Sequence, residues 1–432
     1  MSAATPGPVP EPGCVPWSEA RHIAFGSANP LPPVAVPLAE AIGRTLSRNV
    51  TALQDLPHYA SSAMDGWAVN GPGPWLLGGS GHHTSRPPEG NRFLPANSAS
   101  VIATGGLVPH GADAVLRKES GLVARDTNGN QVLGLHPDAK AGEPRSGQHI
   151  RPAGQEARSG DVLIPAGTVL NPVQVALAAA AGHDTVQVRA RPAVAVVLTG
   201  AEVVTQGIPA PGQVRDTFGP QLGNVVSLLG GVAGAPQRIG DSFGSWLDAL
   251  DGPRMPADAH ADVIITTGGT GKSGTDHFRA AVDALGGQLL VDGIAMRPGH
   301  PAVLAGLPDG RFVVGLPGNP LAALISLLTI GAPLLASLGG AGLPPLQLVM
   351  SGCDLEGDPG RTRLIPCRFL SGLAFPVQHT GPGMMRGLAW AEAVMAVPPQ
   401  GIDSGKPVTV LPLPWAAPPE TTASGTEATM PT

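Results

Sequence analysis

Between positions 190 and 338, long apolar runs alternate with segments that have the spacing of helices. Three of these runs show no alternation of polar and apolar positions, namely 193–200, 261–269 and 311–320. Helices are expected after them, near 218–230, near 275–286 and from position 320 onward. A strand that is buried on both faces reads as a continuous apolar run, as in parallel sheets covered by helices. The pattern therefore predicts a doubly wound α/β domain over residues 191–338.

Shorter segments of strand-like composition lie on both sides of this domain. Residues 51–147 contain short β-like segments separated by spacers rich in Gly, Pro and His, which predicts a small β domain inserted in the chain. Residues 339–411 contain further short strands and predict a small C-terminal β domain. The first residues, to about position 12, and residues 412–432 lack a periodic pattern, so we expect both ends to be disordered.

Local signals predict two more elements. Residues 34–49 read as a strand that enters a short helix. A second helix is expected after position 171, because Asn171 can cap it, Pro172 fits its first turn and Gly182 can end it.

Charge and composition narrow the function classes. The 432 residues include 26 Lys and Arg against 32 Asp and Glu, a formal net charge of −6, and no cluster of basic residues stands out. This balance does not favour a protein that wraps nucleic acid. Because Lys and Arg are sparse, a phosphate ligand would have to be held mainly by backbone amides and helix ends.

The sequence also bears on the compartment. Cys14, Cys353 and Cys367 are widely spaced and fit neither a disulfide framework nor a zinc pattern, so we expect a reducing compartment, the cytoplasm. No apolar segment of a signal peptide occurs in the first 30 residues. The stretch from Phe312 to Cys353 lacks Asp, Glu, Lys and Arg, but Pro and Gly interrupt it. A membrane-spanning helix needs about 20 apolar residues in a row, so we expect a buried strand, a loop and a core helix here.

The stretch TTGGTGKS at 266–273 is close to the nucleotide-binding pattern GxxxxGK(S/T). Gly271, Lys272 and Ser273 supply the end of that pattern, but Thr266 stands where the first Gly is required. No clear metal-binding Asp ends another strand in the manner of such enzymes. A P-loop NTPase that depends on Lys272 is kept as an alternative.

Two of the three apolar strands end in Gly-bearing turns that lead into a helix. In an open α/β sheet the ligand crevice lies at the carboxyl ends of the strands. Successive glycines and the unpaired amides of a helix start can converge there on a phosphate group. The TTGGTG turn and the LPGNP turn (316–320) both fit, with Asn319 able to cap the following helix and Pro320 able to start it. A tight strand-to-helix turn without a ligand is the alternative for each.

Acidic residues are expected near the same edge of the sheet. They are Glu202, Asp216, Asp241 and Asp276. Mg²⁺ prefers carboxylates, water and phosphate oxygens. Their shared placement indicates a metal–phosphate site, and helix caps or solvated carboxylates are the alternative.

Motifs along the chain resemble those of the molybdopterin molybdotransferases, the MoeA/gephyrin family. SSAMDGWAV (61–69) is similar to the family's SAMDGYAV signature, and GLPGNPLAAL (315–324) is similar to its GLPGNP turn. Further matches in the family's order are IATGGLVPHGADAVLRKE (102–119), IRPAGQEARSGDVLIPAGTVLNPVQVALAAAAG (150–182), TGAEVV (199–204), GQVRDTFGP (212–220), TGGTGKSGTD (267–276) and MRPGHP (296–301). The likeness covers roughly residues 15–411. TTGGTG also resembles the small related domains that adenylylate molybdopterin, so this loop resembles a cradle for the molybdopterin phosphate rather than a P-loop.

The resemblance implies a four-part chain and a homodimer. The parts would be a discontinuous linking and dimerisation domain (13–50 and 148–190), the inserted β domain (51–147), the molybdopterin-binding α/β domain (191–338) and the C-terminal β domain (339–411). The α/β domain would face the inserted domain of the other subunit across a cleft. The implied reaction takes molybdate and adenylylated molybdopterin to molybdenum cofactor and AMP, with Mg²⁺. Molybdopterin adenylyltransferase and molybdoenzymes would be partners, and nucleic acid and membranes would not.

The matched motifs also imply individual site residues. Asp65 would reach the site from the inserted domain, and Thr104 and Glu156 would line it. The catalytic acids would be Asp65, Glu202, Asp241 and Asp276, of which Glu202, Asp241 and Asp276 would hold the metal ion. The remaining substrate-binding residues would be Gly268, Gly269, Gly271, Ser273, Arg297, His300, Pro317, Gly318, Asn319 and Pro320.

Four positions depart from the family pattern. Ala60 and Ala201 stand where the family has acidic residues, Phe218 replaces an Asn, and His300 replaces a Lys. At His300 a titratable imidazole thereby replaces a fixed positive charge. These departures keep a further hypothesis open, namely a divergent paralogue that binds molybdopterin or the finished cofactor without chemistry.

Overall fold

The computed structural model describes residues 14–77, 93–252, 260–271 and 277–416. The chain divides into two compact units, and each is described by itself. Unit 1 comprises Met1–Val34, Gly43–Ser47 and Val188–Thr432, and unit 2 comprises Ala35–Ile42 and Arg48–Gln187. The finer division into four parts stays a prediction.

Unit 1 contains an α/β domain built on a seven-stranded sheet with the order β17-β14-β19-β23-β22-β20, in which β18 also pairs with β14. The strands are β14 (Ala193–Leu198), β17 (Val232–Ala233), β18 (Gln237–Arg238), β19 (Val263–Thr267), β20 (Gln288–Asp292), β22 (Val303–Gly306) and β23 (Phe312–Leu316). Strands β17, β18, β19 and β23 are joined to the sheet by parallel pairing, whereas β22 pairs antiparallel with both β23 and β20. The predicted doubly wound domain is confirmed, and the antiparallel extension is an addition to it.

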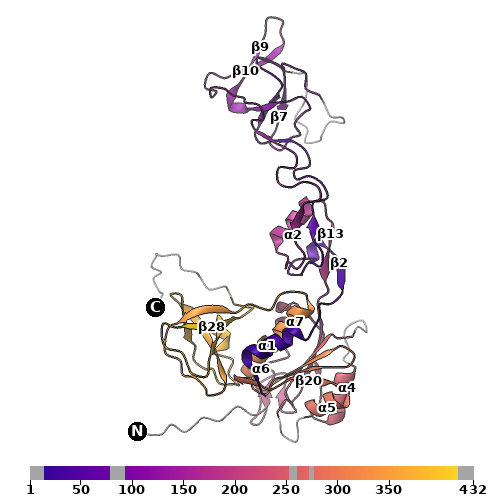
Figure 1. The fold of residues 1–432 in the computed structure, drawn as a ribbon, viewed down its shortest axis with the longest axis vertical. Helices are drawn as coiled ribbons and strands as arrows, with labels where there is room; N and C mark the ends of the chain where they lie inside the picture. The colour runs from indigo at the N-terminus through magenta and orange to yellow at the C-terminus, as the bar shows by residue number, and fades with distance from the viewer. Residues whose placement is uncertain (1–13, 78–92, 253–259, 272–276, 417–432) are drawn as a thin grey trace. The chain divides into compact units, whose positions relative to one another are not determined.

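Helices cover both faces of this sheet. They are α1 (Trp17–Gly26), α3 (Leu222–Leu228), α4 (Phe243–Asp251), α5 (Phe278–Ala284), α6 (Pro320–Ser326) and α7 (Ala332–Leu338), with the π-helical turn η4 (Leu327–Gly331) joining the last two. Alternate residues of each strand serve opposite faces. In β14, Val194 and Val196 pack in the core that includes α1, α3, α6 and α7, while Ala195 and Val197 pack with α4 and α5. Figure 1 shows α4 and α5 together on one side of the domain and α1, α6 and α7 on the other.

The uncharged stretch after Phe312 forms β23, a loop and the helical segment Pro320–Leu338, as the sequence predicts. This is the one helix of the described residues that is long and apolar enough to cross a membrane. Its apolar window is 94% buried inside the protein, as is usual for the core helix of a globular domain.

The C-terminal part of unit 1 is a small β barrel. Its sheet has the order β1-β21-β25-β26-β24-β28-β27, and β25 also pairs with β27, which closes the last five strands on themselves. The strands are β1 (Val15–Pro16), β21 (Ile294–Arg297), β24 (Gln347–Ser351), β25 (Thr362–Leu370), β26 (Leu373–Pro376), β27 (Ala393–Val397) and β28 (Pro407–Pro412). The prediction that disorder begins at position 412 is wrong, because Leu413 directly follows β28, packs in the apolar core and is only 3% exposed. Residues 1–13 and 417–432 lie outside the described residues.

Unit 2 contains a six-stranded sheet with the order β8-β5-β7-β6-β10-β9, as expected for an inserted β domain. Its strands are β5 (Gly66–Val69), β6 (Trp75–Leu77), β7 (Ser98–Ile102), β8 (Ala114–Arg117), β9 (Gly121–Arg125) and β10 (Gln131–Leu135). Trp75 and Leu133 are buried at its centre.

The rest of unit 2 consists of short paired strands and one helix. The pairs are β3 (Val50–Thr51) with β12 (Val162–Ile164) and β4 (Ser61–Ser62) with β11 (Ile150–Arg151). The helix α2 (Pro172–Ala180) begins as predicted, with a capping box in which the Asn171 side chain accepts from the Gln174 amide. The segment predicted as a strand and short helix contains β2 (Pro33–Pro37), which pairs with β13 (Thr185–Arg189), and a single 3₁₀ turn at Leu38–Glu40.

Candidate functional site

Four strands of the α/β sheet end in one row. Leu198 of β14 is in register with Arg238 of β18 and Thr267 of β19, and Thr267 is in register with Leu316 of β23. The chain goes from β14 outward to β17 and β18 on one side, and then to β19 on the other side. This reversal makes the edge between β14 and β19 a topological switch point, the place where open α/β sheets bind ligands.

The loop after β19 can be formed only by glycine. Gly268 and Gly269 have φ angles of +81° and +64°, in the left-handed region that glycine adopts at little cost. A Cβ at Gly268 would lie 2.5 Å from the Thr199 Oγ1, and one at Gly269 would lie 2.4 Å from Cζ2 of Trp246. The predicted glycine loop therefore has both a conformational and a steric reason for its composition.

Backbone and hydroxyl contacts join the turns at this edge. The Thr199 hydroxyl donates to the Thr267 carbonyl oxygen at 2.6 Å. The Gly268 amide donates to the Leu316 carbonyl oxygen at 2.9 Å, so it continues the β19–β23 ladder by one residue. The Gly268 amide is thus engaged in the sheet, and its expected role toward a phosphate stays a prediction. The amides of Gly269 and Gly271 have no hydrogen-bond partner among the described residues.

Arg279 of α5 fixes the far end of the glycine loop. Its Nη1 donates to the carbonyl oxygens of Thr270 at 2.8 Å and Gly271 at 2.9 Å, while Nε and Nη2 donate to Oδ1 of Asp292 at 2.9 and 2.6 Å. The C=O and N–H of a trans peptide point in opposite directions. Because Arg279 holds the Thr270 carbonyl, the Gly271 amide points away from the guanidinium. Sequence reasoning missed Arg279, since nothing local marks an arginine in a helix as a partner of the loop before it.

The loop rests on a buried aromatic pair. Trp246 of α4 and Phe278 of α5 meet edge to face, with ring centroids 5.9 Å apart. The hydroxyls of Thr266 and Thr267 are buried at the end of β19 and have no hydrogen-bond partner among the described residues. Unpaired buried polar groups are costly and call for an explanation such as a ligand or water at the site. Thr266 is 0% exposed inside the strand, so the position of the first P-loop glycine is not part of the loop at all.

The LPGNP turn lies beside the glycine loop. A Cβ at Gly318 would have the Gly268 Cα as its nearest neighbour, at 3.9 Å. Pro317 is buried, whereas Gly318 and Asn319 are exposed, and Pro320 starts α6 as expected. Asn319 occupies the N-cap position, but its side chain makes no cap hydrogen bond. The Ala322 amide of the first turn donates instead to the Pro382 carbonyl oxygen of the C-terminal part, at 3.2 Å.

The acidic residues of unit 1 have different surroundings. Glu202 and Asp241 are both exposed after the strand ends of β14 and β18, and the Glu202 carboxylate lies over Gly200, where a Cβ would be 3.0 Å from Oε2. Asp216 is engaged in the fold, because Oδ1 accepts from the amides of Phe218 and Gly219 and Oδ2 pairs with Arg238. Its surroundings favour the cap alternative for Asp216. No group of three metal-ligating side chains is assembled within the described part of the chain.

The MRPGHP turn lies at the start of β22, next to α6. Arg297 is largely exposed and pairs with Asp358 at 3.5 Å. The His300 Nδ1 donates to the Ile294 carbonyl oxygen at 2.9 Å, and the Cys14 Sγ lies 3.9 and 4.0 Å from the two ring nitrogens. The imidazole therefore contacts Ile294 and Cys14, and its role toward an anionic substrate stays a prediction.

In unit 2 the structure brings Asp65 and Thr104 together. Asp65 Oδ1 accepts from the Thr104 amide at 2.7 Å and from the Thr104 hydroxyl at 2.9 Å. Both residues are exposed. Glu156 is also exposed, and its amide donates to the Leu56 carbonyl oxygen. Three residues of the sequence argument, Lys272, Ser273 and Asp276, lie outside the described residues.

Family models match nearly the whole described chain. The MoeA N-terminal region (domain I and II) matches residues 15–182, a probable molybdopterin binding domain matches 195–337, and the MoeA C-terminal region (domain IV) matches 349–413. The glycine loop, the LPGNP turn and the acids of unit 1 all lie in the second of these regions.

Similar proteins support the same relationship. A molybdopterin molybdenumtransferase from Nostoc sp. is 31% identical over 412 residues, which is 88% of this chain and 88% of the relative. A protein of the same name from Staphylococcus aureus is 27% identical over 342 residues, 76% of each chain. The crystal structure of a molybdopterin biosynthesis MoeA protein from Pyrococcus horikosii matches with a TM-score of 0.71 and 26% identity, covering 92% of this chain and 99% of that one.

Proposed function

Because the chain belongs to the molybdopterin molybdenumtransferase family, and is thus a transferase of molybdenum cofactor biosynthesis, we propose that it inserts molybdate into adenylylated molybdopterin and releases AMP. The observation that carries this proposal is the loop at the switch point, in which the amides of Gly269 and Gly271 have no partner among the residues that the structure describes. Unpaired backbone amides in a glycine-rich loop can bind phosphate groups. Adenylylated molybdopterin offers such a group at the bond that must break.

The glycine loop would hold the phosphate without a basic side chain from its own described residues. The amide of Gly271 is oriented by Arg279, and Gly318 on the neighbouring turn places no side chain beside Gly268. Preorganised amides need no rearrangement as charge develops at the phosphate, which is the main protein contribution in phosphoryl chemistry. Phosphate binding by backbone amides fits a chain that is poor in Lys and Arg.

Mg²⁺ fits the donor chemistry of the same edge. In phosphate sites this ion commonly takes one or two protein carboxylates and completes its shell with water and phosphate oxygens. Glu202 and Asp241 are exposed carboxylates at adjacent strand ends, and Asp276 would be the third donor that the resemblance implies. When bound, the ion would neutralise charge on molybdate and on the departing AMP.

We further propose that the site is completed across a homodimer, with Asp65 and Thr104 of the partner's inserted domain facing the glycine loop. The short hydrogen bonds between these two residues support the proposal, because they hold an exposed carboxylate in a fixed orientation. A two-fold dimer would contain two equivalent sites. The cytoplasm stays the expected compartment.

The direct test follows AMP release by purified protein given adenylylated molybdopterin, molybdate and Mg²⁺. We expect turnover that is lost in Asp241→Asn and in Asp65→Asn, while both variants keep their fold because the side-chain shape is preserved. Absence of AMP release by folded, unmodified protein would reject the proposal.

Subunit mixing tests the shared site separately. If the two acids act from opposite subunits, an equal mixture of Asp65→Asn and Asp241→Asn chains forms heterodimers with one intact site, restoring about a quarter of the activity. A mixture that stays inactive although the subunits exchange, or a protein that is monomeric in solution, would contradict the dimer.

Two residues at positions of the family motifs make contacts within the protein itself, and this favours a second function. Asp216 is engaged by Arg238 and by the amides that follow it, and the His300 ring is engaged by the Ile294 carbonyl oxygen and Cys14. A chain with these features could hold molybdopterin or the finished cofactor without chemistry. Tight binding of molybdopterin with no AMP release would select this alternative.

A further inference from the structure

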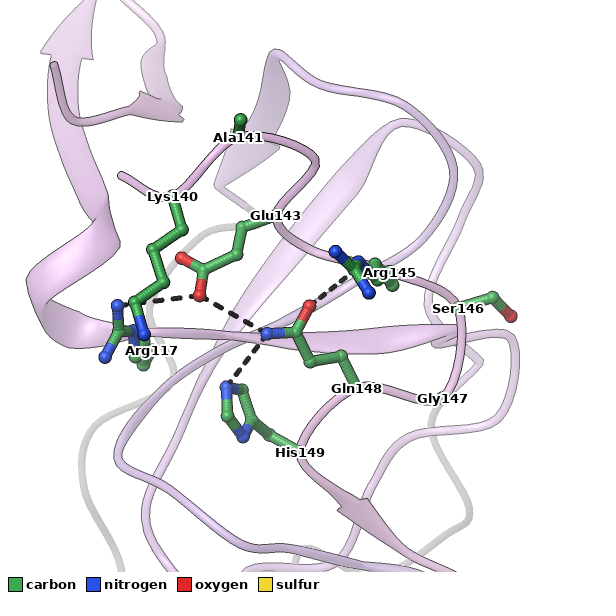
Figure 2. A pocket seen from close by; sticks show the side chains of 9 residues that line it. All are labelled: Arg117, Lys140, Ala141, Glu143, Arg145, Ser146, Gly147, Gln148 and His149. Carbon is green, nitrogen blue, oxygen red and sulfur yellow. Dashed lines mark hydrogen bonds and ion pairs between the residues drawn. The ribbon is translucent and has the colours of Figure 1, made fainter. Parts of the chain in front are cut away.

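A basic pocket lies in the inserted sheet of unit 2, outside the site described above. It has a volume of about 500 Å³ and is lined mainly by polar side chains. The residues that matter are Arg117, Lys140, Glu143, Arg145, Gln148 and His149, and Figure 2 shows them grouped around one hollow. Arg117, Lys140 and Arg145 are separated along the chain, so they do not stand out as a basic cluster in the sequence.

The only acid in the pocket is already neutralised. Glu143 receives a hydrogen bond of 2.6 Å from the Ser120 hydroxyl and one of 3.3 Å from Gln148, and it pairs with Arg117 at 3.5 Å. These contacts, the Ser120 hydroxyl first, lower the pKa of Glu143 below its ordinary value. The carboxylate thus serves to hold Arg117 and Gln148 in place.

The other cations of the pocket have unused charge. Lys140 and Arg145 are exposed, and neither side chain forms an ion pair or hydrogen bond with any described residue. Arg117, Lys140 and Arg145 against Glu143 leave a net charge of +2 in the hollow, on a chain whose formal net charge is −6. A concentration of one sign in a concave site attracts a ligand of the opposite sign.

The wall formed by residues 145–149 is held by hydrogen bonds of the Gln148 side chain. Gln148 accepts from the Arg145 amide at 2.7 Å and donates to the His149 Nε2 at 3.2 Å. His149 has a φ of 58°, a backbone conformation that is uncommon outside glycine. The pocket is therefore built by a network and not only by flexible surface chains.

Backbone hydrogen bonds connect the walls of the pocket to the loop that carries Asp65. Arg117 is in register with Gly66, and the Lys118 amide donates to the Asp65 carbonyl oxygen at 2.9 Å. On the other flank the Ala63 amide donates to the His149 carbonyl oxygen at 2.8 Å. Two residues that line the pocket, Arg117 and His149, are thus tied through the backbone to the loop that carries the proposed catalytic acid.

We propose that this pocket binds a doubly charged tetrahedral oxyanion, held by Arg117, Lys140 and Arg145. Arg side chains match the geometry of oxyanions and Lys supplies a point charge. The two anions that the reaction provides are free molybdate and the phosphate of AMP, and this choice of source rests on the proposed function. The pocket itself rests on the geometry of unit 2 alone.

The experiment titrates the full-length protein separately with sodium molybdate, inorganic phosphate and AMP at low ionic strength, followed by calorimetry. We expect at least one anion to bind, with affinity that falls as salt rises because the cations are exposed. The double variant Lys140→Met/Arg145→Met should weaken that binding on the order of tenfold. The matched control is Arg125→Met, which removes an exposed arginine of β9 that is not part of the pocket. Hydrogen exchange of residues 140–149 should slow when the anion is present.

Each outcome decides the matter. Binding of molybdate alone supports the pocket and identifies free molybdate, whereas binding of phosphate and AMP supports it and identifies the nucleotide phosphate. No binding of any of the three anions, or equal binding by the double variant, overturns the pocket. AMP release is a separate readout, so anion binding without turnover would reject the proposed function and leave the pocket standing.

Discussion

Replacement of Gly269 by alanine should be far more damaging than the loss of an ordinary flexible glycine. Two costs add at this position. An alanine with a φ of +64° pays about 1 kcal/mol for the left-handed conformation. Its Cβ would also lie 2.4 Å from Trp246, a side chain that is 1% exposed and cannot move aside. Overpacking of this kind typically costs about 1–3 kcal/mol, so we expect a loss of about 2–4 kcal/mol.

Gly310 is the matched control, because it has a φ of +89° and nothing within 4 Å of the added Cβ. Gly310→Ala should cost about 1 kcal/mol or less, since the conformational cost is partly offset by reduced freedom of the unfolded chain. Urea unfolding of the full chain, followed by tryptophan fluorescence, compares the two variants. With a slope of about 2 kcal/mol per molar urea, the extra loss moves the midpoint down by roughly 1 M.

A double variant identifies the clash as the cause. In a Trp246→Leu background the far ring atoms are gone, so Gly269→Ala should there cost no more than Gly310→Ala does. Equal urea midpoints for the two single alanine variants would refute the steric reasoning. An undiminished cost of Gly269→Ala in the Trp246→Leu background would refute it as well.

Further predictions concern the loop, the barrel and the inserted domain. Arg279→Met should leave the protein folded but weaken binding of molybdopterin substrates on the order of tenfold, because the Gly271 amide loses its orientation; unchanged affinity by fluorescence titration would contradict this. Burial raises the pKa of the Cys367 thiol to about 12, so this thiol should resist iodoacetamide at pH 8 until urea unfolds the protein, and its contribution to stability should be lost as pH rises from about 9 towards 12. Mass spectrometry of the labelled peptides checks this, and rapid labelling of native protein would disprove the burial. Asp65→Ala should lower stability by about 1–2 kcal/mol through loss of the Thr104 hydrogen bonds, whereas Asp65→Asn should not, as thermal melting of the two variants would show.

The sequence predicts most of the α/β framework because its signals are local. Strands such as β14 and β19 are continuous apolar runs, and α2 carries a cap and a proline at its start. The helix α1 has no such signal, since its buried face consists of Trp17, two alanines and the buried Arg21. A short helix whose inner face is mostly small or charged cannot be recognised from hydrophobic spacing.

The sequence predicts the glycine loop of the candidate site, but it does not predict the contacts that hold the loop. Glycines after an apolar strand predict the loop, yet the partner of the Gly268 amide comes from the neighbouring strand, and the partner of Asp216 lies 22 residues further along the chain at Arg238. Such contacts depend on which strands become neighbours. The sequence pattern limits those neighbours, but it does not fix which donor meets which acceptor.

One apolar core of unit 1 is shared by the α/β sheet and the barrel, and this has a consequence for how the chain could have been assembled. Leu364, Val394 and Leu411 of the barrel belong to the same buried cluster as Val194 of the sheet and Leu321 of α6. A shortened polypeptide that ended before the barrel would expose this side of α6 to solvent. The Ala322 amide would also lose its acceptor, the Pro382 carbonyl oxygen. The α/β domain is therefore not packed as an independent unit in this protein, and gain or loss of the C-terminal part by gene fusion would have required repacking of the interior.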